Sequence, residues 1–221
     1  METVYDLLDG LPADAALRAP PAAMTAREVQ ATAYRTGNYL RAHGVHRGSP
    51  VGVVDERRPK PLFAVLGATL LAAPVRFDPP RDFDGRALVA PTAALDDYEL
   101  GPGGQRIGYG AKPASPADAH FEGGVWSENP AFPPVAFDGD VPVLAGADDP
   151  SQRELLAAAA ERADALDADD VLAVRAPLAS PATLTAVLGA FAAGATVLLP
   201  DADAVGTVAV ADGDAPEDRT V

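Results

Sequence analysis

The hydrophobic and polar positions of residues 25–42 predict an amphipathic helix. Thr25 and Glu28 have the spacing of a capping box, and the apolar positions that follow recur every three or four residues. Gly44 then provides the residue type that most often ends a helix. The sequence therefore marks both ends of this helix.

A strand–helix–strand unit is predicted directly after this helix. Val51–Val54 is a short apolar run between a proline and an acidic residue, which is typical of a buried strand. Pro61 can begin a helix that runs to about Ala72, and Pro74–Phe77 has the length and composition of a second strand.

The same arrangement returns near the C-terminus. Val171–Val174 predicts a strand, Ser180 and Pro181 can cap and begin a helix to about Ala193, and 195–199 predicts the next strand. Two such units favour an α/β fold with a layered, parallel-type sheet and flanking helices. Ser151 and Glu154 have the spacing of another capping box, which predicts a helix to about Leu166. Further candidate strands are 87–90, 141–144 and 207–210.

Glycine and proline divide the chain into segments. Residues 100–140 contain Gly-Pro-Gly-Gly and five further prolines, which predict an irregular connector, either a mobile flap or a tether between two halves. We expect one α/β subdomain over 1–99, a second over 141–210, and an acidic, frayed tail over 211–221. Together these segments predict one compact domain.

The charge composition predicts the salt environment of the protein and argues against two classes of binding partner. The chain has 32 Asp and Glu against 17 Lys and Arg, for a net charge of −15, and 23 of the acidic residues are Asp. An acidic surface that is poor in lysine stays hydrated where concentrated salt screens long-range repulsion, so the composition predicts a halophilic protein. It argues against nucleic acid or an anionic membrane as a partner, because both favour a basic patch.

The absence of cysteine excludes disulfides, thiolate metal sites and cysteine nucleophiles. The N-terminus Met-Glu-Thr-Val-Tyr-Asp lacks the basic start and apolar run of a secretion signal, and no apolar stretch reaches the length of a membrane span. The sequence therefore predicts a cytoplasmic protein.

The clustered basic residues of the chain are Arg57, Arg58 and Lys60. They follow a predicted strand and begin a predicted helix, which is where α/β sheets often bind anions. The alternative is that they are ordinary exposed loop charges.

The histidines and the acidic clusters are weaker candidates for a metal site. His43 and His46 have a spacing that could share a metal, but a histidine at a helix C-terminus more often interacts with the helix dipole. The Asp148–Asp149 pair and the aspartates of 167–170 could hold Mg²⁺ or Ca²⁺, but acidic clusters in so acidic a chain are typical of solvated surface. We nominate no metal ligand and no catalytic residue.

Two stretches carry strings in an order that resembles a known family. Residues 24–80 contain Thr-Ala-Arg-Glu-Val, then Leu-Arg-Ala-His-Gly-Val-His-Arg-Gly-Ser-Pro-Val, then Leu-Gly-Ala and Pro-Val-Arg-Phe-Asp-Pro. Residues 169–200 contain Asp-Asp-Val-Leu-Ala-Val-Arg-Ala-Pro-Leu and a helix-like segment that leads to a final Leu-Leu-Pro. These strings, about 90 of 221 residues, resemble the N-terminal region of acyl-CoA and acetyl-CoA synthetases in the adenylate-forming (AMP-binding) superfamily. The resemblance implies that family's α/β fold.

The resemblance places the ATP phosphate-binding loop at residues 144–154. In the family this loop is rich in Thr, Ser and Gly and ends in Pro-Lys-Gly, so that N–H groups, hydroxyls and a lysine surround the phosphates. Gly146, Pro150 and Ser151 match the family's loop approximately in position and form a remnant of it. Other residues replace the family's run of hydroxyl side chains and its lysine. Asp148 and Asp149 would repel a triphosphate. The chain departs from the family's motif at the phosphate contacts themselves.

Other family positions also differ. The aromatic–His pair that follows Pro-Leu in the family is Ala179-Ser180 here, and the later nucleotide-binding motifs and the catalytic lysine have no counterpart before Val221. These departures from the family's pattern predict that this chain alone does not adenylate a substrate. ATP, AMP or CoA are the cofactors that the family suggests, without an intact motif to hold them.

Two functions stay open on the sequence. One is a non-catalytic or degenerate adenylate-forming-like domain with a binding or regulatory role. The other is a ligase-like protein that binds nucleotide, acyl group or CoA and needs a partner chain for activity. We also expect self-association or a protein partner at an apolar face, where the family's remaining half would pack.

Overall fold

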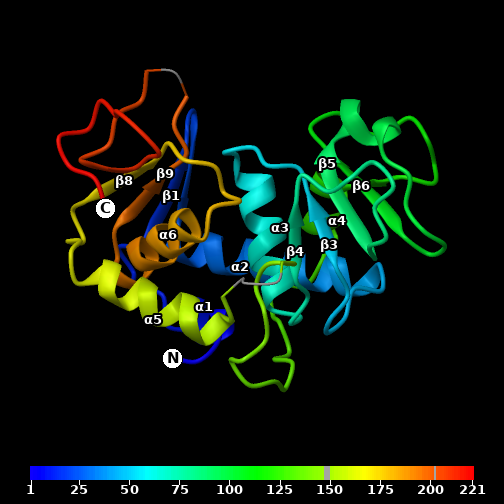
Figure 1. Ribbon diagram of the computed structural model, residues 1–221, viewed down its shortest axis with the longest axis horizontal. Coiled ribbons are helices and arrows are strands. Elements are labelled where there is room, and N and C mark those ends of the chain that lie inside the picture. Colours follow the sequence, from blue (N-terminus) through cyan, green and yellow to red (C-terminus); the bar gives the residue numbers. More distant parts are fainter. Residues whose placement is uncertain (147–149, 202) are drawn as a thin grey trace.

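The computed structural model describes residues 1–146, 150–201 and 203–221, and in this part of the chain the strands form two five-stranded sheets. One sheet has the strand order β4-β3-β5-β6-β7 and the other has the order β10-β8-β9-β1-β2 (Figure 1). The mixed α/β architecture predicted from the sequence is confirmed. The two strand–helix–strand units lie in different sheets rather than in one.

All strands of the first sheet run parallel, which buries short runs of Val, Ala and Leu. Helix α3 (Pro59–Thr69) connects β3 to β4 as the sequence predicts, and it begins two residues earlier than Pro61. The strands are β3 (Val51–Val53), β4 (Val75–Phe77), β5 (Ala87–Pro91), β6 (Gln105–Tyr109) and β7 (Ala119–His120).

The second sheet is parallel apart from its N-terminal hairpin. Helix α6 (Pro181–Ala193) connects β8 to β9 and ends at Gly194, whose φ of 79° favours glycine. The strands are β1 (Ala16–Ala19), β2 (Ala22–Thr25), β8 (Val171–Val174), β9 (Thr196–Leu198) and β10 (Val208–Val210).

The remaining helices pack around the sheets. Thr25 forms the predicted capping box with Glu28, and the helix that it begins packs closely on α3. A Cβ at Gly67 would lie 2.9 Å from the amide nitrogen of Gly37, so these glycines allow the close approach of the two helices. The helices are α1 (Val4–Asp9), α2 (Ala26–Ala42), α4 (Phe121–Ser127), α5 (Gln152–Ala163) and a 3-10 helix (Thr92–Asp97).

The N-terminal hairpin β1–β2 is an element that the sequence analysis did not predict. Strand β1 pairs in parallel with β9, with Ala16 opposite Thr196, while β2 pairs antiparallel to β1. The first strand of the chain therefore belongs to the sheet built by its last third. Long-range pairing of this kind leaves no local pattern in a four-residue strand.

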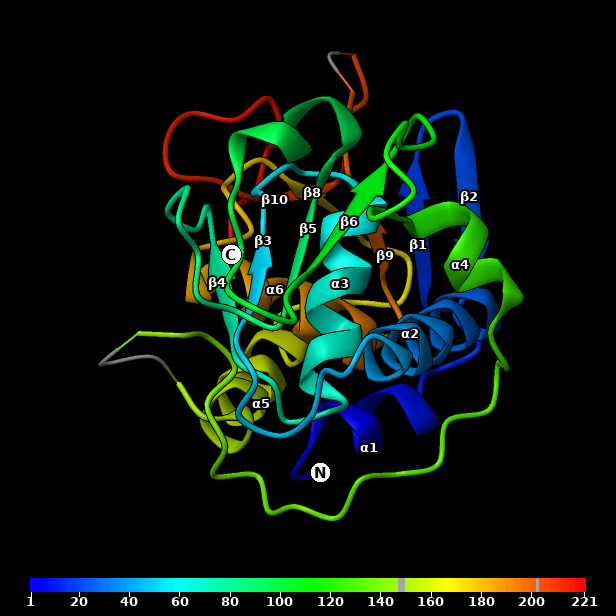
Figure 2. The ribbon, with the colours of Figure 1, turned by 90° about the vertical axis from the view of Figure 1, so that its right-hand side faces the viewer.

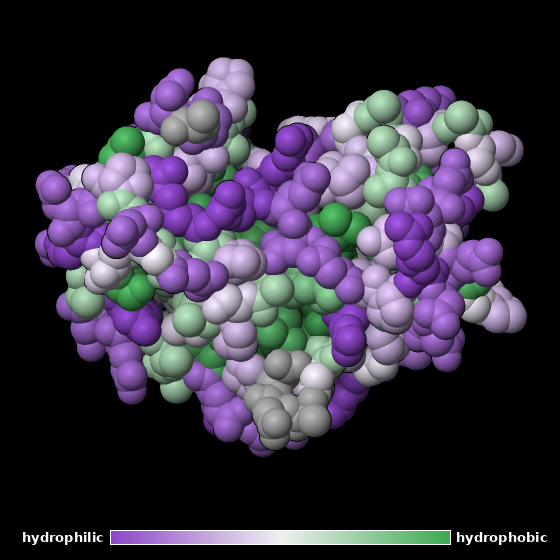
Figure 3. All heavy atoms as spheres, turned by 45° about the horizontal axis from the view of Figure 1, so that its top comes forward, coloured by the Kyte–Doolittle hydropathy of each residue, from purple (hydrophilic) through white to green (hydrophobic). Residues whose placement is uncertain are grey.

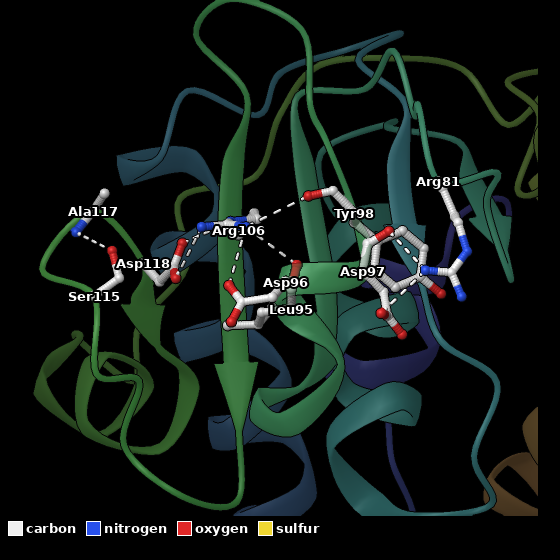
Figure 4. A network of polar contacts seen from close by, with 9 residues as sticks. All are labelled: Arg81, Leu95, Asp96, Asp97, Tyr98, Arg106, Ser115, Ala117 and Asp118. Atoms are coloured by element: carbon white, nitrogen blue, oxygen red, sulfur yellow. Dashed lines mark hydrogen bonds and ion pairs between the residues drawn. The ribbon is translucent and has the colours of Figure 1, made fainter.

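The segment 100–140 is more regular than predicted, because it contains β6, β7 and α4. Figure 4 shows why it is ordered: Arg106 on β6 donates to both carboxylate oxygens of Asp118, at 2.8 and 3.2 Å, and to the carbonyl of Leu95 at 3.2 Å. Asp118 has a side chain that is 5% exposed. The expectation of an irregular connector is wrong for these elements, and it fits residues 128–140 after α4, where the chain runs below α2 and α1 (Figure 2).

The acidic tail is also ordered, so the prediction that it frays is wrong. The Glu217 side chain is fully buried, and its carboxylate accepts from Arg175 Nε at 3.1 Å and Nη2 at 2.5 Å. Ala209 on β10 donates to the Arg219 carbonyl at 2.8 Å and accepts from the Val221 amide at 3.0 Å. The tail thus lies along the free edge of β10 and satisfies its main-chain groups.

The predicted strand at 141–144 forms only isolated bridges, from Pro142 to Ser151 and from Leu144 to Val75. The proline has no amide hydrogen to extend the pairing. In the described part of the chain no helix is both long enough and apolar enough to cross a membrane.

Candidate functional site

An open cleft of about 500 Å³ lies where strands of both sheets end, so it is the natural place to look for a ligand. Figure 3 brings this side of the molecule toward the viewer and shows hydrophilic residues running across its middle. The loops after β3, β4, β8 and β9 line the cleft with Asp55, Glu56, Arg57, Arg58, Asp78, Pro177 and Pro200.

Asp55 connects the two sheets at this cleft. Its Oδ1 accepts from the amide of Leu178 at 3.1 Å and its Oδ2 accepts from the amide of Ala179 at 2.9 Å. Its own amide donates to Oδ1 of Asp78 at 2.9 Å. Burial raises the pKa of the Asp55 carboxyl and Asp78 raises it further, against the lowering effect of the two amides. Both oxygens of the Asp55 carboxylate are therefore held by main-chain donors.

Glu56 is a second acidic residue of the cleft, next to Asp55 in the sequence. Tyr109 Oη, at the end of β6, donates to Glu56 Oε2 at 2.9 Å, and Arg58 Nε lies 3.3 Å from the same oxygen. Burial and the Glu56 contact raise the pKa of Tyr109 far above its ordinary value, so this hydroxyl stays protonated.

The predicted anion-binding residues do not converge on one point. Arg57 donates to the carbonyl of Arg175, Arg58 pairs with Glu56, and Lys60 pairs with Glu122 at 3.6 Å. The two arginines line the cleft, whereas Lys60 is not among its lining residues. An anion site at these three residues remains a prediction.

Ser151, which the family resemblance places in the phosphate-binding loop, begins a helix. Ser151 is the N-cap of α5, and its Oγ donates to Glu154 Oε2 at 2.7 Å and accepts from the Glu154 amide at 3.3 Å. Pro150 lines a separate open groove with the first residues of α6, and Gly146 is exposed. Asp148 and Asp149 lie outside the described residues. Phosphate binding at Gly146, Pro150 and Ser151 remains a prediction.

Replacing Ser151 with alanine should lower the free energy of unfolding by about 1 kcal/mol, because the first turn of α5 loses its cap. Denaturant unfolding measures this loss. Ser180→Ala is the matched control, since Ser180 also precedes a helix but its side chain makes no capping hydrogen bond. Equal losses in the two variants would contradict the capping role.

The histidines and the other acidic cluster are engaged within the chain. His43 Nδ1 lies 2.9 Å from the Tyr39 carbonyl, and His46 Nδ1 lies 3.1 Å from the Arg47 carbonyl. Asp170 accepts from Arg219 at 2.6 Å and from the Thr207 hydroxyl at 2.8 Å. Within 1–146, 150–201 and 203–221, no group of three or more His, Asp or Glu side chains is placed to hold a metal ion.

The sequence analysis missed Asp55 and Asp78 as residues of the cleft. A usable signal was present, because each follows a predicted strand by one residue, and polar residues at that position face the ligand side of a parallel sheet. What the sequence does not show is that the Asp55 carboxylate reaches a turn more than a hundred residues away.

Comparison with solved structures finds similar folds among acyl-CoA ligases. A benzoate CoA ligase from Burkholderia xenovorans matches with a TM-score of 0.73 and 20% identity, over 93% of this chain and 48% of that one. The anthranilate CoA ligase AuaEII, solved in complex with anthranoyl-AMP, matches with a TM-score of 0.72 and 20% identity, over 90% and 45%. A long-chain-fatty-acid-CoA ligase from Archaeoglobus fulgidus matches with a TM-score of 0.64 and 15% identity, over 89% and 46%.

These similarities show the fold: a mixed α/β arrangement that resembles the N-terminal domain of acyl-CoA synthetases. The chain spans less than half the length of these three ligases. No protein-family model and no curated protein sequence matches it.

Proposed function

We propose that this chain is an adenylate-forming-like domain with a binding or regulatory role, and that it does not adenylate a substrate by itself. The observation that carries the proposal is the lining of the cleft. Three carboxylates, Asp55, Glu56 and Asp78, face the space at the strand ends, and the arginines beside them already bond to acceptors of the protein.

Electrostatics explains why such a cleft is unsuited to ATP. Two like unit charges 4 Å apart near a protein surface repel by about 4 kcal/mol. A triphosphate at this cleft would meet the carboxylates of Asp55, Glu56 and Asp78, and the loop at 144–154 contains no lysine to offset them. Binding a triphosphate at this cleft would therefore need cations that come from outside this chain.

A second function is supported by the fold. Similar folds occur in CoA ligases, one of them solved with an acyl-adenylate, and the cleft lies where α/β sheets bind ligands. A protein that binds a nucleotide, an acyl group or CoA and needs a partner chain to complete its site is therefore the alternative. It requires that the cleft binds one of these ligands in solution.

The binding role that we propose is with a protein, either a second copy or another chain. Trp126 on α4 is 67% exposed, and the guanidinium of Arg35 lies over its ring, 5.1 Å from the ring centroid. An exposed tryptophan beside an arginine is the composition that protein interfaces favour.

Thermal unfolding tests the proposal. We expect no change in the melting temperature when MgATP, MgAMP or CoA is added at millimolar concentration, because a ligand raises it only by binding the native state. Molar KCl is the working buffer that the acidic composition suggests, and light scattering in the same buffer measures the oligomeric state.

The outcomes separate the two functions. A clear rise in melting temperature with any of the three ligands would overturn the first proposal and favour the ligand-binding alternative. A strictly monomeric chain in light scattering would contradict self-association and leave a different protein as the expected partner.

A further inference from the structure

The turn at 177–180 presents two consecutive main-chain N–H groups to one carboxylate. The Ser180 amide donates to the Pro177 carbonyl at 3.2 Å, which closes the turn. The amides of Leu178 and Ala179 then point to the same side, and each donates to a different oxygen of Asp55. Successive amides that converge in this way form the kind of concave site that binds anions in many proteins.

The occupant of this site comes from the other sheet. Asp55 follows β3, whereas the turn follows β8, so the carboxylate crosses the boundary between the two sheets. Beside it Arg57 donates to the carbonyl of Arg175, also across this boundary. The chain's own carboxylate thus takes a position that an external ligand could otherwise fill.

Asp55 itself, rather than the two amides, faces the solvent. Asp55 and Pro177 line the open cleft of about 500 Å³, whereas Leu178 is fully buried. Removing the Asp55 side chain would therefore open the turn toward the cleft. We propose that the Leu178 and Ala179 amides form an oxyanion site for a carboxylate, which Asp55 occupies and closes in the resting protein.

An internal occupant has a strong advantage over a free ligand. Because Asp55 is tied to the same chain, its effective concentration at the turn is far above the millimolar concentration of a free carboxylate. The wild-type protein should therefore bind no small carboxylate at the turn, and removing the Asp55 side chain should expose the site. The inference stands apart from the proposed function, because it holds whether or not the wild-type cleft binds nucleotide.

Amide NMR shifts during a formate titration test the inference. In Asp55→Ala, the Leu178 and Ala179 amide signals should shift saturably, with a dissociation constant in the millimolar range or weaker, as expected for so small a ligand. In the wild type the same signals should stay unchanged at equal ionic strength. Glu56→Gln is the matched control, since it removes another charge of the cleft while its side chain contacts Tyr109 and Arg58 rather than Asp55, and it should behave as the wild type does.

Several results would overturn the inference. A folded Asp55→Ala whose two amides do not respond to formate would show that the turn is no oxyanion site, and an equal response in the wild type would show that Asp55 does not close it. If Asp55→Ala fails to fold, Asp55→Ser is used, because its side chain is too short to fill the position of the carboxylate at the two amides. Its two amides should respond to formate, and no response would again contradict the site.

Discussion

Replacing Gln152 with leucine is expected to lower the free energy of unfolding by roughly 4 kcal/mol. Gln152 is fully buried at the start of α5, where its Oε1 accepts from the Val4 amide at 2.9 Å and its Nε2 donates to the Thr69 carbonyl at 2.7 Å. One side chain therefore connects the beginning of α1, the end of α3 and the beginning of α5. Leucine is similar in size but leaves both main-chain groups unpaired, and each buried unpaired group costs about 1–3 kcal/mol.

Denaturant unfolding measures the effect, with Gln30→Leu as the matched control. Gln30 also bonds to the main chain, through Nε2 to the Leu8 carbonyl at 2.9 Å, but it is only partly buried. We expect the control to lose about 1 kcal/mol, because water can replace its single bond. A Gln152→Leu loss no greater than that of the control would show that the Val4 and Thr69 groups find other partners.

The second large loss, roughly 3 kcal/mol, is expected for Glu217→Ala. The Glu217 carboxylate is fully buried against Arg175 and also accepts from the Gly206 amide at 3.1 Å. Removing one partner of a buried ion pair costs about 3–5 kcal/mol, because the other charge is left without compensation. Since 21% of the Arg175 side chain is exposed, water can reach it, and the loss should fall at the lower end of that range.

The pH dependence of the free energy of unfolding shows whether the Glu217–Arg175 ion pair causes the loss in Glu217 variants. The Arg175 hydrogen bonds lower the pKa of Glu217, so the pair stabilises the fold at pH values above the unfolded-state pKa of about 4.3. This stability is lost as the pH falls through the lower native pKa. The stability difference between wild type and Glu217→Gln should therefore be constant near neutral pH and shrink below about pH 4.

Asp218→Ala controls for loss of charge in the same segment. Asp218 is exposed, and its replacement should change the free energy of unfolding by less than about 0.5 kcal/mol. If Glu217→Ala loses no more than this control, or if its loss does not depend on pH, the ion pair does not hold the tail on the sheet edge.

The candidate site was predictable only in part. Arg57 and Arg58 do line the cleft, as their position after a strand suggested, but Lys60 points to Glu122 instead. A position relative to a strand end predicts the edge of a sheet on which a residue lies. Which acceptor a long side chain then meets depends on neighbouring loops, and those loops come from distant parts of the sequence.

Two helix starts could be predicted completely from the sequence. The capping boxes at Thr25 and Ser151 join residues three apart, so the sequence alone contains the whole interaction. The strands Val51–Val53 and Val171–Val174 were equally visible, because both belong to short apolar runs bounded by a proline or by charged residues. The tail at 211–221 could not be predicted in this way. Its acidic composition suggested fraying, but the tail is ordered because it bonds to Arg175 and to the edge of β10.

The sequence by itself determined the local units of this protein: the capped helices, the two strand–helix–strand units and the α/β class. Only the tertiary structure decided that these units lie in two sheets, that β1 joins β9, and that Asp55 and Glu217 are held by groups far away along the chain. The physical reason is the range of the interactions. A cap or an amphipathic face is set within a few residues, whereas strand partners and buried polar contacts are chosen among all the surfaces that the folded chain brings together.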